Sequence, residues 1–289
     1  MLDHSLFNVP NRLTYPPFKN GLYLEEYFKK YFDEKKPEVK RTYIPLLWTN
    51  FQLDLSFLKH KQELQQQLDE FVKLNPNEHG YFTVIQHDEG GHLTLPPNTL
   101  VFNGGNNGDV PLPLIYEDEN NTLVTSREKS TDVKRDILCS FVGRNTHTIR
   151  KTIYEAYRTN SSFKFLYIQG GAKVDSKTQS DFINVTLQSK FALAPRGYGR
   201  SSFRFFEIMQ LGAVPIYVWD DKNWLPYQDK LNYDEFAIVI HESQITNLYE
   251  ILSKKTDEEY KIMASNVDKY KSFFTLEYMA EYIVDRCAN

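Results

Sequence analysis

The chain has 289 residues, a net charge of −4 and a hydrophobic fraction of 41%. This length suits two modest domains with real cores, and the ordinary composition excludes a disordered chain. The acidic balance argues against a broad nucleic-acid-binding surface, and no stretch reaches the roughly 20 apolar residues that span a bilayer. The N-terminus lacks the basic start and apolar core of a signal peptide, so we expect a soluble, cytoplasmic protein without a membrane span.

The first half of the chain has an irregular alternation of helical and extended patterns. The predicted elements are a helix at 21–32, a strand at 42–48, a helix at 55–74 and strands at 81–86 and 100–102. Pro45 weakens the first of these strands because proline cannot donate to a sheet. The polar stretch at 117–122 is the best candidate for a linker between domains.

The second half is more regular, because apolar runs of about five residues alternate with amphipathic helices. The predicted strands lie at 137–142, 163–168, 190–194, 213–218 and 236–240, and the predicted helices at 147–157, 181–188, 203–211, 243–253 and 257–271. This alternation is typical of a parallel sheet with helices on both faces. We therefore predict an α/β protein of two Rossmann-like domains facing a cleft, at 1–125 and 126–271. A final helix in 272–289 is expected to pack back on the first domain.

The most informative segment is SKFALAPRGYGRSSFRFFEIMQLGAVPIYVWDD, at 189–221. It reads as a strand, a glycine-rich turn, a helix and a second strand. The turn brings arginines, hydroxyls and unpaired backbone N–H groups to a helix N-terminus, which suits a phosphate. The alternative is a capped helix with solvated arginines. Glu207, on the same helix, either compensates the helix dipole or accepts the hydroxyls of a ribose.

This segment resembles the exostosin family of glycosyltransferases, together with LPYQDKLNYDEFAIVI (225–240) after it and DILCSFVGR (136–144) before it. That family has a similar order of motifs: a SKF-type strand, P-R-G, S-x-R-x-x-E, G-x-V-P-I, paired aspartates and a Leu-Pro-aromatic step. The resemblance covers about residues 135–252, and several motifs in order are far more specific than one. It implies the GT-B architecture, with a UDP-sugar bound in the C-terminal domain.

Carried over position by position, the resemblance implies a donor site around the turn. Arg144 and Arg196 look like diphosphate contacts, and Glu207 like the ribose-binding acid. Asp220 and Asp221 either contact the sugar or cap their loop. The full predicted donor-binding set is Gly143, Arg144, Gln169, Gly170, Arg196, Gly197, Ser201, Ser202, Arg204, Glu207, Asp220 and Asp221.

The catalytic base is expected in the N-terminal half, where HDE follows the strand at 81–86. Inverting transfer needs a base that removes the proton of the acceptor hydroxyl, which contributes on the order of 10²–10⁴-fold. Asp88 is the first candidate and Glu89 the second, whereas His87 either acts itself or orients a carboxylate. The alternative is a solvated acidic turn. Arginines and helix-end amides can neutralise the leaving UDP, so we predict no metal and no other cofactor.

The resemblance implies an inverting glycosyltransferase with an N-terminal acceptor-binding domain and a C-terminal nucleotide-sugar-binding domain. UDP-xylose is favoured as the donor because the chain most resembles soluble viral members of the family. The acceptor is expected to be a hydroxyl of a glycan or glycoprotein. The alternative is an inactive module that binds a nucleotide sugar or a glycan without chemistry.

Three further features have a plain structural interpretation. Cys139 lies in an apolar run and is predicted to pack as a small buried hydrophobe, without a disulfide or zinc framework. Trp48 and Trp224 can stack on sugar rings, although core packing is the safer interpretation. The polar loop at 102–109 either touches the acceptor or forms a surface turn, and we expect the turn.

Overall fold

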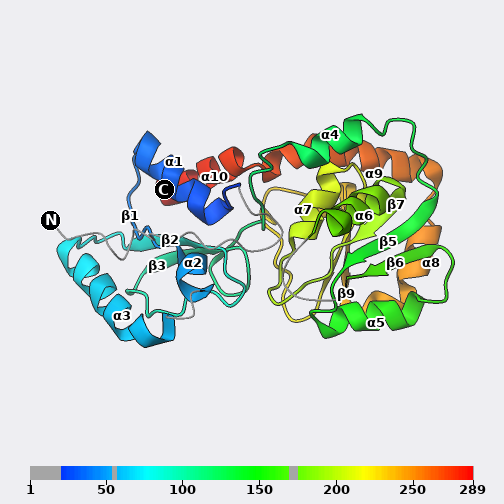
Figure 1. Ribbon diagram of the computed structural model, residues 1–289. Coiled ribbons are helices and arrows are strands. Elements are labelled where there is room, and N and C mark those ends of the chain that lie inside the picture. The colour runs from blue at the N-terminus through cyan, green and yellow to red at the C-terminus, as the bar shows by residue number, and fades with distance from the viewer. Residues whose placement is uncertain (1–20, 54–56, 169–174, 289) are drawn as a thin grey trace.

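The computed structural model describes residues 21–53, 57–168 and 175–288, and contains two parallel sheets that lie side by side (Figure 1). The first sheet has the strand order β1-β2-β3-β4. Its strands are β1 (Thr42–Tyr43), β2 (Tyr81–Ile85), β3 (Thr99–Asn103) and β4 (Val110–Pro111). The helices of this half are α1 (Leu24–Lys35), α2 (Trp48–Leu53) and α3 (Phe57–Leu74).

The second sheet has the order β6-β5-β7-β8-β9, also entirely parallel. Its strands are β5 (Ile137–Gly143), β6 (Phe163–Tyr167), β7 (Ser189–Leu193), β8 (Val214–Trp219) and β9 (Ile238–His241). The order reverses between β5 and β7, and ligands of open α/β sheets bind at the carboxyl ends of the strands at such a switch point. The loops after β5 and β7 are therefore the place to look for a site.

Helices cover both faces of the second sheet. They are α4 (Thr122–Glu128), α5 (Thr148–Tyr157), α6 (Ser176–Leu187), α7 (Phe203–Gln210), α8 (Leu248–Ser253) and α9 (Asp257–Tyr270), with short 3₁₀ turns η2 (Tyr233–Glu235), η3 (Glu242–Asn247) and η4 (Lys271–Phe274). Ser202 caps α7 by accepting a hydrogen bond from Arg204 N at 3.3 Å. Gly212 ends this helix with a φ of +71°, the left-handed conformation typical of helix C-termini.

The last helix, α10 (Leu276–Ala288), crosses back to the first half of the chain and lies beside α1 (Figure 1). Lys40 N donates to the carbonyl of Cys287 at 3.0 Å. The predicted boundary after residue 125 falls inside α4, which packs against α6 and α7, so the exact division of the chain stays a prediction.

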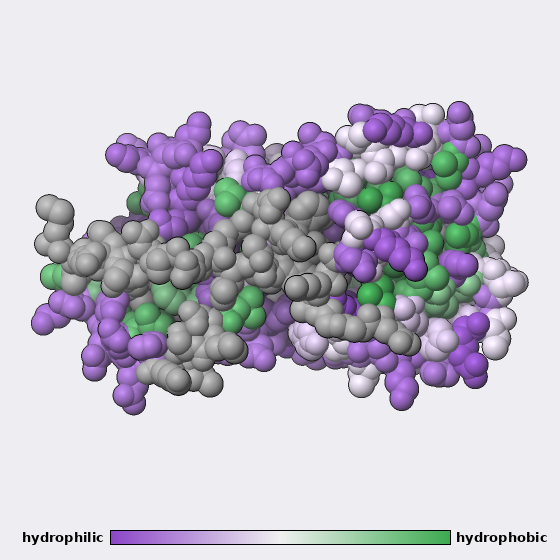
Figure 2. Space-filling view, viewed as in Figure 1, coloured by the Kyte–Doolittle hydropathy of each residue, from purple (hydrophilic) through white to green (hydrophobic). Residues whose placement is uncertain are grey.

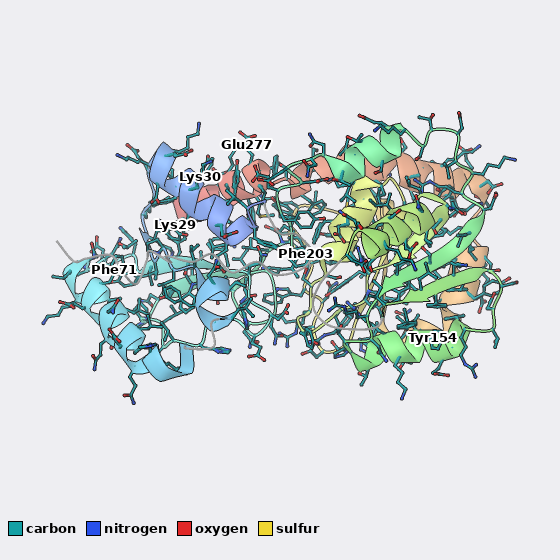
Figure 3. The ribbon with its side chains drawn as sticks, viewed as in Figure 1. Lys29, Lys30, Phe71, Tyr154, Phe203 and Glu277 are labelled. Carbon is teal, nitrogen blue, oxygen red and sulfur yellow. The ribbon has the colours of Figure 1, made fainter. Side chains whose placement is uncertain are left out.

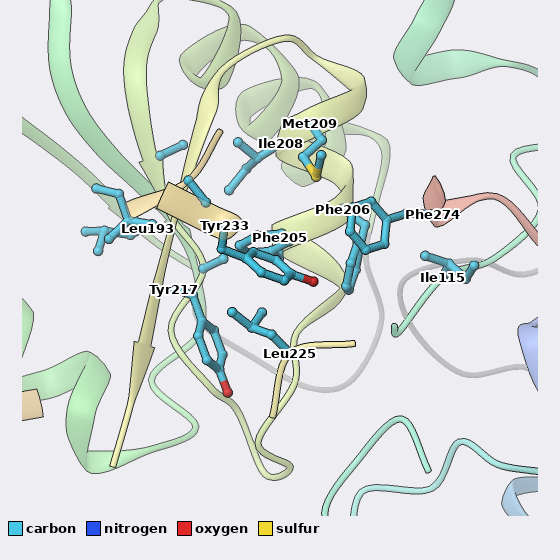
Figure 4. Packing of buried hydrophobic residues seen from close by; sticks show 14 of the residues in the cluster. Ile115, Leu193, Phe205, Phe206, Ile208, Met209, Tyr217, Leu225, Tyr233 and Phe274 are labelled. Atoms are coloured by element: carbon cyan, nitrogen blue, oxygen red, sulfur yellow. The ribbon is translucent and has the colours of Figure 1, made fainter. Parts of the chain in front are cut away.

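The core around α7 is rich in aromatic side chains (Figure 4). Phe205 packs edge-on against Tyr217, with ring centroids 6.3 Å apart, and Phe206 packs against Phe274 at 5.1 Å. Phe203 lies between the two halves of the molecule (Figure 3) and contacts Tyr116, with ring centroids 5.8 Å apart. One apolar cluster therefore joins both sheets, so the two halves are packed on each other rather than merely linked.

The predicted buried residues are confirmed. Cys139 is fully buried, and Trp48 and Trp224 are both core residues. Each indole N–H has a partner: Trp48 Nε1 donates to Thr83 Oγ1 at 2.8 Å, and Trp224 Nε1 donates to Asn103 O at 3.0 Å. The second of these bonds crosses from one half of the molecule to the other.

The outer surface over α1 is hydrophilic (Figure 2). Among the helices of the described ranges, none is both long enough and apolar enough to cross a lipid bilayer.

Most predicted elements are confirmed within a few residues, and the largest error concerns the strand predicted at 42–48. Only Thr42 and Tyr43 pair with β2, and α2 begins already at Trp48. Pro45 explains the early end of this strand because it has no N–H to donate. The elements α2, α4 and β4 were not predicted, and α6 begins earlier than expected, at a cap where Asp175 accepts from Thr178 N.

Candidate active site

The turn after β7 is fixed by a buried arginine on α5. Arg150 Nε donates to the carbonyl of Arg196 at 2.9 Å. Its two terminal nitrogens donate to the carbonyls of Arg144 at 2.9 Å and Pro195 at 3.1 Å. Burial lowers the pKa of Arg150 to about 10, which leaves it charged at neutral pH. One guanidinium thus joins the loops after β5 and β7 at the switch point. Arg150 was not among the predicted site residues. Its one signal in the sequence is a cation in the first turn of a helix, where acidic residues are favoured.

The two arginines of the turn itself, Arg196 and Arg200, are paired with the two aspartates that follow β8. Arg196 Nη1 lies 2.8 Å from Asp220 Oδ1 and 3.4 Å from Asp221 Oδ1. Arg200 Nε donates to Asp221 Oδ1 at 2.9 Å, and this hydrogen bonding lowers the pKa of Asp221. His147 Nε2 also lies 3.7 Å from Asp220 Oδ2. The alternative of solvated arginines therefore does not hold for Arg196 and Arg200, because their guanidinium groups are paired with aspartates.

Two buried polar atoms beside the turn form no hydrogen bond within the described residues, namely Thr146 Oγ1 and Arg196 Nε. Buried polar atoms are normally paired, so these two could be completed by a bound polar ligand or by water. A Cβ placed on Gly197 would come within 3.4 Å of Thr146 Oγ1 and 3.2 Å of Arg150 Nη2. The chain is therefore packed closely here, and a side chain larger than that of glycine would have to push these groups aside.

Glu207 is buried on α7 and is already hydrogen-bonded on both oxygens. Tyr116 OH donates to its Oε1 at 2.7 Å, and Arg204 Nη1 lies 2.8 Å from its Oε2. Arg204 Nε also donates to Val142 O at 3.1 Å, and its guanidinium lies 3.6 Å from the centre of the Phe182 ring. Each carboxylate oxygen has a second lone pair, so Glu207 retains capacity for further donors. It also lines a cavity of about 470 Å³ beside α7.

The other predicted donor residues have structural positions consistent with a tight turn. Ser202 is the helix cap, and Ser201 is buried beside it. Gly143 ends β5, and a Cβ on it would approach the Phe141 ring to 2.7 Å. Gln169 and Gly170 lie outside the described residues.

The three predicted catalytic residues differ in where they point. Asp88 accepts a hydrogen bond from Gly199 N, and a Cβ on Gly199 would lie 2.8 Å from Asp88 Oδ1. Burial raises the pKa of Asp88 above its ordinary value. His87 and Glu89 instead belong to a cluster with His92, whose Nε2 lies 3.0 Å from Glu89 Oε2. Of these three residues, Asp88 is the one in contact with the turn.

The loop at 102–109 is not the plain surface turn that the sequence suggested. The carbonyl of Gly105 accepts a hydrogen bond from Arg200 N at 2.7 Å, and the carbonyl of Asn106 accepts one from Arg200 Nη1. A Cβ on Gly105 would come within 2.6 Å of Asp88 Cα. This loop follows β3 and the Asp88 loop follows β2, so the carboxyl ends of the two sheets face each other across the turn.

This fold and site define a class: an α/β protein with two parallel, Rossmann-like sheets and a polar site at the switch point of the second. Residues 86–255 match the family model described as the Exostosin GT47 domain, which is more than half of the chain. The chain belongs to the exostosin GT47 family.

Two curated relatives and one solved structure extend this comparison. An Exostosin-1 homolog of Caenorhabditis elegans is 31% identical over 97 residues, which cover 32% of this chain and 25% of the relative. A probable glycosyltransferase of Arabidopsis thaliana is 24% identical over 139 residues, covering 48% and 28%. Both matches span about a quarter of the relative's length. The structure of WaaG, a glycosyltransferase involved in lipopolysaccharide biosynthesis, is 12% identical with a TM-score of 0.41 and covers 79% of this chain and 83% of WaaG.

Proposed function

We propose that this protein is an inverting glycosyltransferase that transfers a sugar from a UDP-sugar to a hydroxyl of a glycan or glycoprotein. The observation that carries the proposal is the arginine-lined turn after β7 at the switch point of the second sheet, which the Asp88 loop contacts through the hydrogen bond from Gly199 N to Asp88. Membership of the exostosin GT47 family supports transfer of a glycosyl group.

On this proposal the diphosphate binds at the turn after β7. The N-terminus of α7 offers unpaired backbone N–H groups and a favourable dipole. Arg144 and Arg196 add charge, and the absence of a side chain at Gly197 lets the backbone of the turn come close to a phosphate. Glu207 accepts the ribose hydroxyls through the lone pairs that Tyr116 and Arg204 leave free.

Asp88 is the proposed base. It removes the proton of the acceptor hydroxyl while that oxygen forms a bond to the anomeric carbon, and the bond from this carbon to the phosphate oxygen breaks. The bonding electrons leave with UDP, and Asp88 holds the proton. Its contact with the Gly199 N–H places the carboxylate beside the diphosphate turn, which supports this choice. Glu89 and His87 rank behind it because their side chains meet His92 instead.

We further propose that the leaving UDP needs no metal at the diphosphate. Asp220 and Asp221, the two adjacent acids after β8, are paired with Arg196 and Arg200 and so present no free pair of carboxylates to a cation. The positive groups of the turn can neutralise the leaving group instead.

The finer assignments rest on resemblance. On the resemblance of its motifs to the chlorovirus exostosin-domain xylosyltransferase, we propose UDP-xylose as the donor. A cytoplasmic location stays a prediction from the sequence.

The decisive experiment measures UDP binding and UDP release with the same preparations. A bound nucleotide stabilises the fold by about 3 kcal/mol at a concentration 100 times its Kd, which a thermal-shift series detects. We expect stabilisation by UDP with or without EDTA, and a larger effect of UDP-xylose than of GDP-sugars. Glu207→Ala and Arg204→Ala should abolish the shift, whereas Arg158→Ala, an exposed arginine on the α5 side, should not change it.

Turnover separates an enzyme from a binding module. Asp88→Ala should keep the UDP-induced shift and stop UDP release in the presence of donor and acceptor. A wild-type protein that binds UDP but releases none with any glycan acceptor would be an inactive binding module. A wild-type protein that does not bind UDP at all would sink the proposal.

A further inference from the structure

The loop after β2 gathers three metal-ligating side chains that the proposed transfer does not use together. They are His87, Glu89 and His92, and one ligand atom of each lies within 4.8 Å of the others. His92 Nε2 is 3.0 Å from Glu89 Oε2, and the two imidazole rings meet edge to face with centroids 5.6 Å apart. Their spacing in the sequence, H-x-E-x-x-H, keeps all three on one short loop.

The loop is rigidly supported from outside the cluster. Gln52 Nε2 donates to the carbonyl of Gly90 at 2.8 Å, and Gln52 Oε1 accepts from His92 N at 2.8 Å. Gly90 has a φ of +80°, a conformation that glycine adopts without strain. A Cβ on Gly91 would meet the Trp48 ring at 3.1 Å, so the backbone is seated against the core there. This support brings the ligands together before any ion arrives.

We propose that His87, Glu89 and His92 form a binding site for one divalent transition-metal ion of the Zn²⁺ class. Two imidazoles and one carboxylate are a donor set that zinc prefers, with water as the fourth ligand. Donors around tetrahedral zinc are about 3.4 Å apart, so the cluster closes by little more than an ångström. Glu89 is exposed and supplies that movement, and the ion replaces the 3.2 Å hydrogen bond from Glu89 N to His87 Nδ1.

The metal site is separate from the turn after β7, where the diphosphate is proposed to bind, although the two are neighbours. Asp88, between two of the ligands, faces Gly199 of the turn. An ion bound by His87 and Glu89 therefore restricts the movement of the backbone on both sides of Asp88. The role of the metal is to hold this loop and to position the carboxylate, whereas the charge of UDP is neutralised elsewhere.

The test is direct metal binding by the full chain. After treatment with EDTA and dialysis, isothermal titration with ZnCl₂ should give one equivalent of bound Zn²⁺. His92→Ala should weaken the affinity at least about 10-fold, since even the loss of an outer-shell partner typically costs that much. His60→Ala is the matched control, because His60 is also a surface histidine, 3.5 Å from Glu63, outside the cluster.

A second readout does not depend on a variant that folds. CoCl₂ added to the wild-type protein should give the visible absorption of tetrahedral Co²⁺, and ZnCl₂ should displace it. The proposal is overturned if the wild-type protein binds no Zn²⁺, or if folded His92→Ala binds it as tightly as His60→Ala. Because none of these readouts uses UDP or turnover, the transferase proposal can fail or stand independently.

Discussion

At the scale of single residues, the site divides into side chains that a motif reveals and side chains that it does not. Ser202 and Glu207 could be predicted because helix capping and a helix-borne acid are local properties of the sequence. Arg150 could not, because its partners are backbone carbonyls of residues 144, 195 and 196. The pairing of the turn's arginines with Asp220 and Asp221 was missed for the same reason, since the fold brings together residues about 20 positions apart.

The role of Arg150 leads to a prediction. Arg150→Met should lower the free energy of unfolding by roughly 2–4 kcal/mol, because it leaves three carbonyls without their charged donor. It should also weaken UDP binding, because the turn loses its fixed shape. Urea denaturation and UDP titration measure the two effects. Lys151→Met, on an exposed position of the same helix, should change neither, and equal effects of both substitutions would contradict the role of Arg150.

At the scale of elements, periodicity identified the long helices and the buried strands but not short segments whose structure depends on a tertiary partner. The helix α2 is such a segment. Its first turn is held by Glu25 of α1, whose carboxylate accepts from Thr49 N at 3.0 Å. The same carboxylate accepts from Gln86 N at 2.8 Å, at the end of β2. A glutamate on a predicted helix gives no sign in the sequence that it will be buried between three elements.

Glu25 should make the stability of the protein depend on pH. Burial raises its pKa from 4.5 to about 8, and the neighbouring Glu26 adds to this effect. Between these two pH values the folded state holds a proton on Glu25 that the unfolded state releases. The contribution of Glu25 to the free energy of unfolding is therefore complete below pH 4.5 and is lost as the pH rises toward about 8. The expected slope is on the order of 1 kcal/mol per pH unit within that window.

Urea denaturation at several pH values measures this slope. Glu25→Gln keeps the shape of the side chain and cannot ionise, so its stability should be flat over the same window. Glu34→Gln, an exposed acid of the same helix, should retain the wild-type slope. A wild-type stability that rises from pH 5 to 8 would show that Glu25 is not protonated in the folded protein.

At the scale of the whole molecule, the two parallel, Rossmann-like sheets were correctly predicted, because alternating strands and helices specify parallel sheets. The contacts between the two halves could not be predicted. They join Arg200 to Gly105, Trp224 to Asn103 and Glu207 to Tyr116, pairs separated by about 90 residues or more. No local pattern encodes such pairs, so the loop at 102–109 looked like ordinary surface.

Gly105 provides the test of this junction. Gly105→Ala places a methyl group within 2.5 Å of His87 O and 2.6 Å of Asp88 Cα, so the loops after β2 and β3 must move apart, and the Gly105 carbonyl that accepts from Arg200 N moves with them. A misplacement of about 1 Å can cost 10²-fold in rate, and we expect a loss of turnover of that order. UDP binding should change little because the turn after β7 stays intact. Asn107→Ala on the same loop loses only a long contact of 3.4 Å with Arg200 Nη1 and should reduce turnover much less. A Gly105→Ala protein of normal turnover would show that the junction tolerates movement.

At the turn, the charges of two ion pairs, Arg196 with Asp220 and Arg200 with Asp221, sum to zero. The turn therefore carries its own counter-ions, and an arriving diphosphate exchanges one set of anions for another instead of meeting bare positive charge. Such an exchange releases few bound ions from the protein into the solution, so the affinity for UDP should depend only weakly on ionic strength. The same exchange works in reverse after transfer, because the aspartates compete for the arginines and help the spent nucleotide to leave.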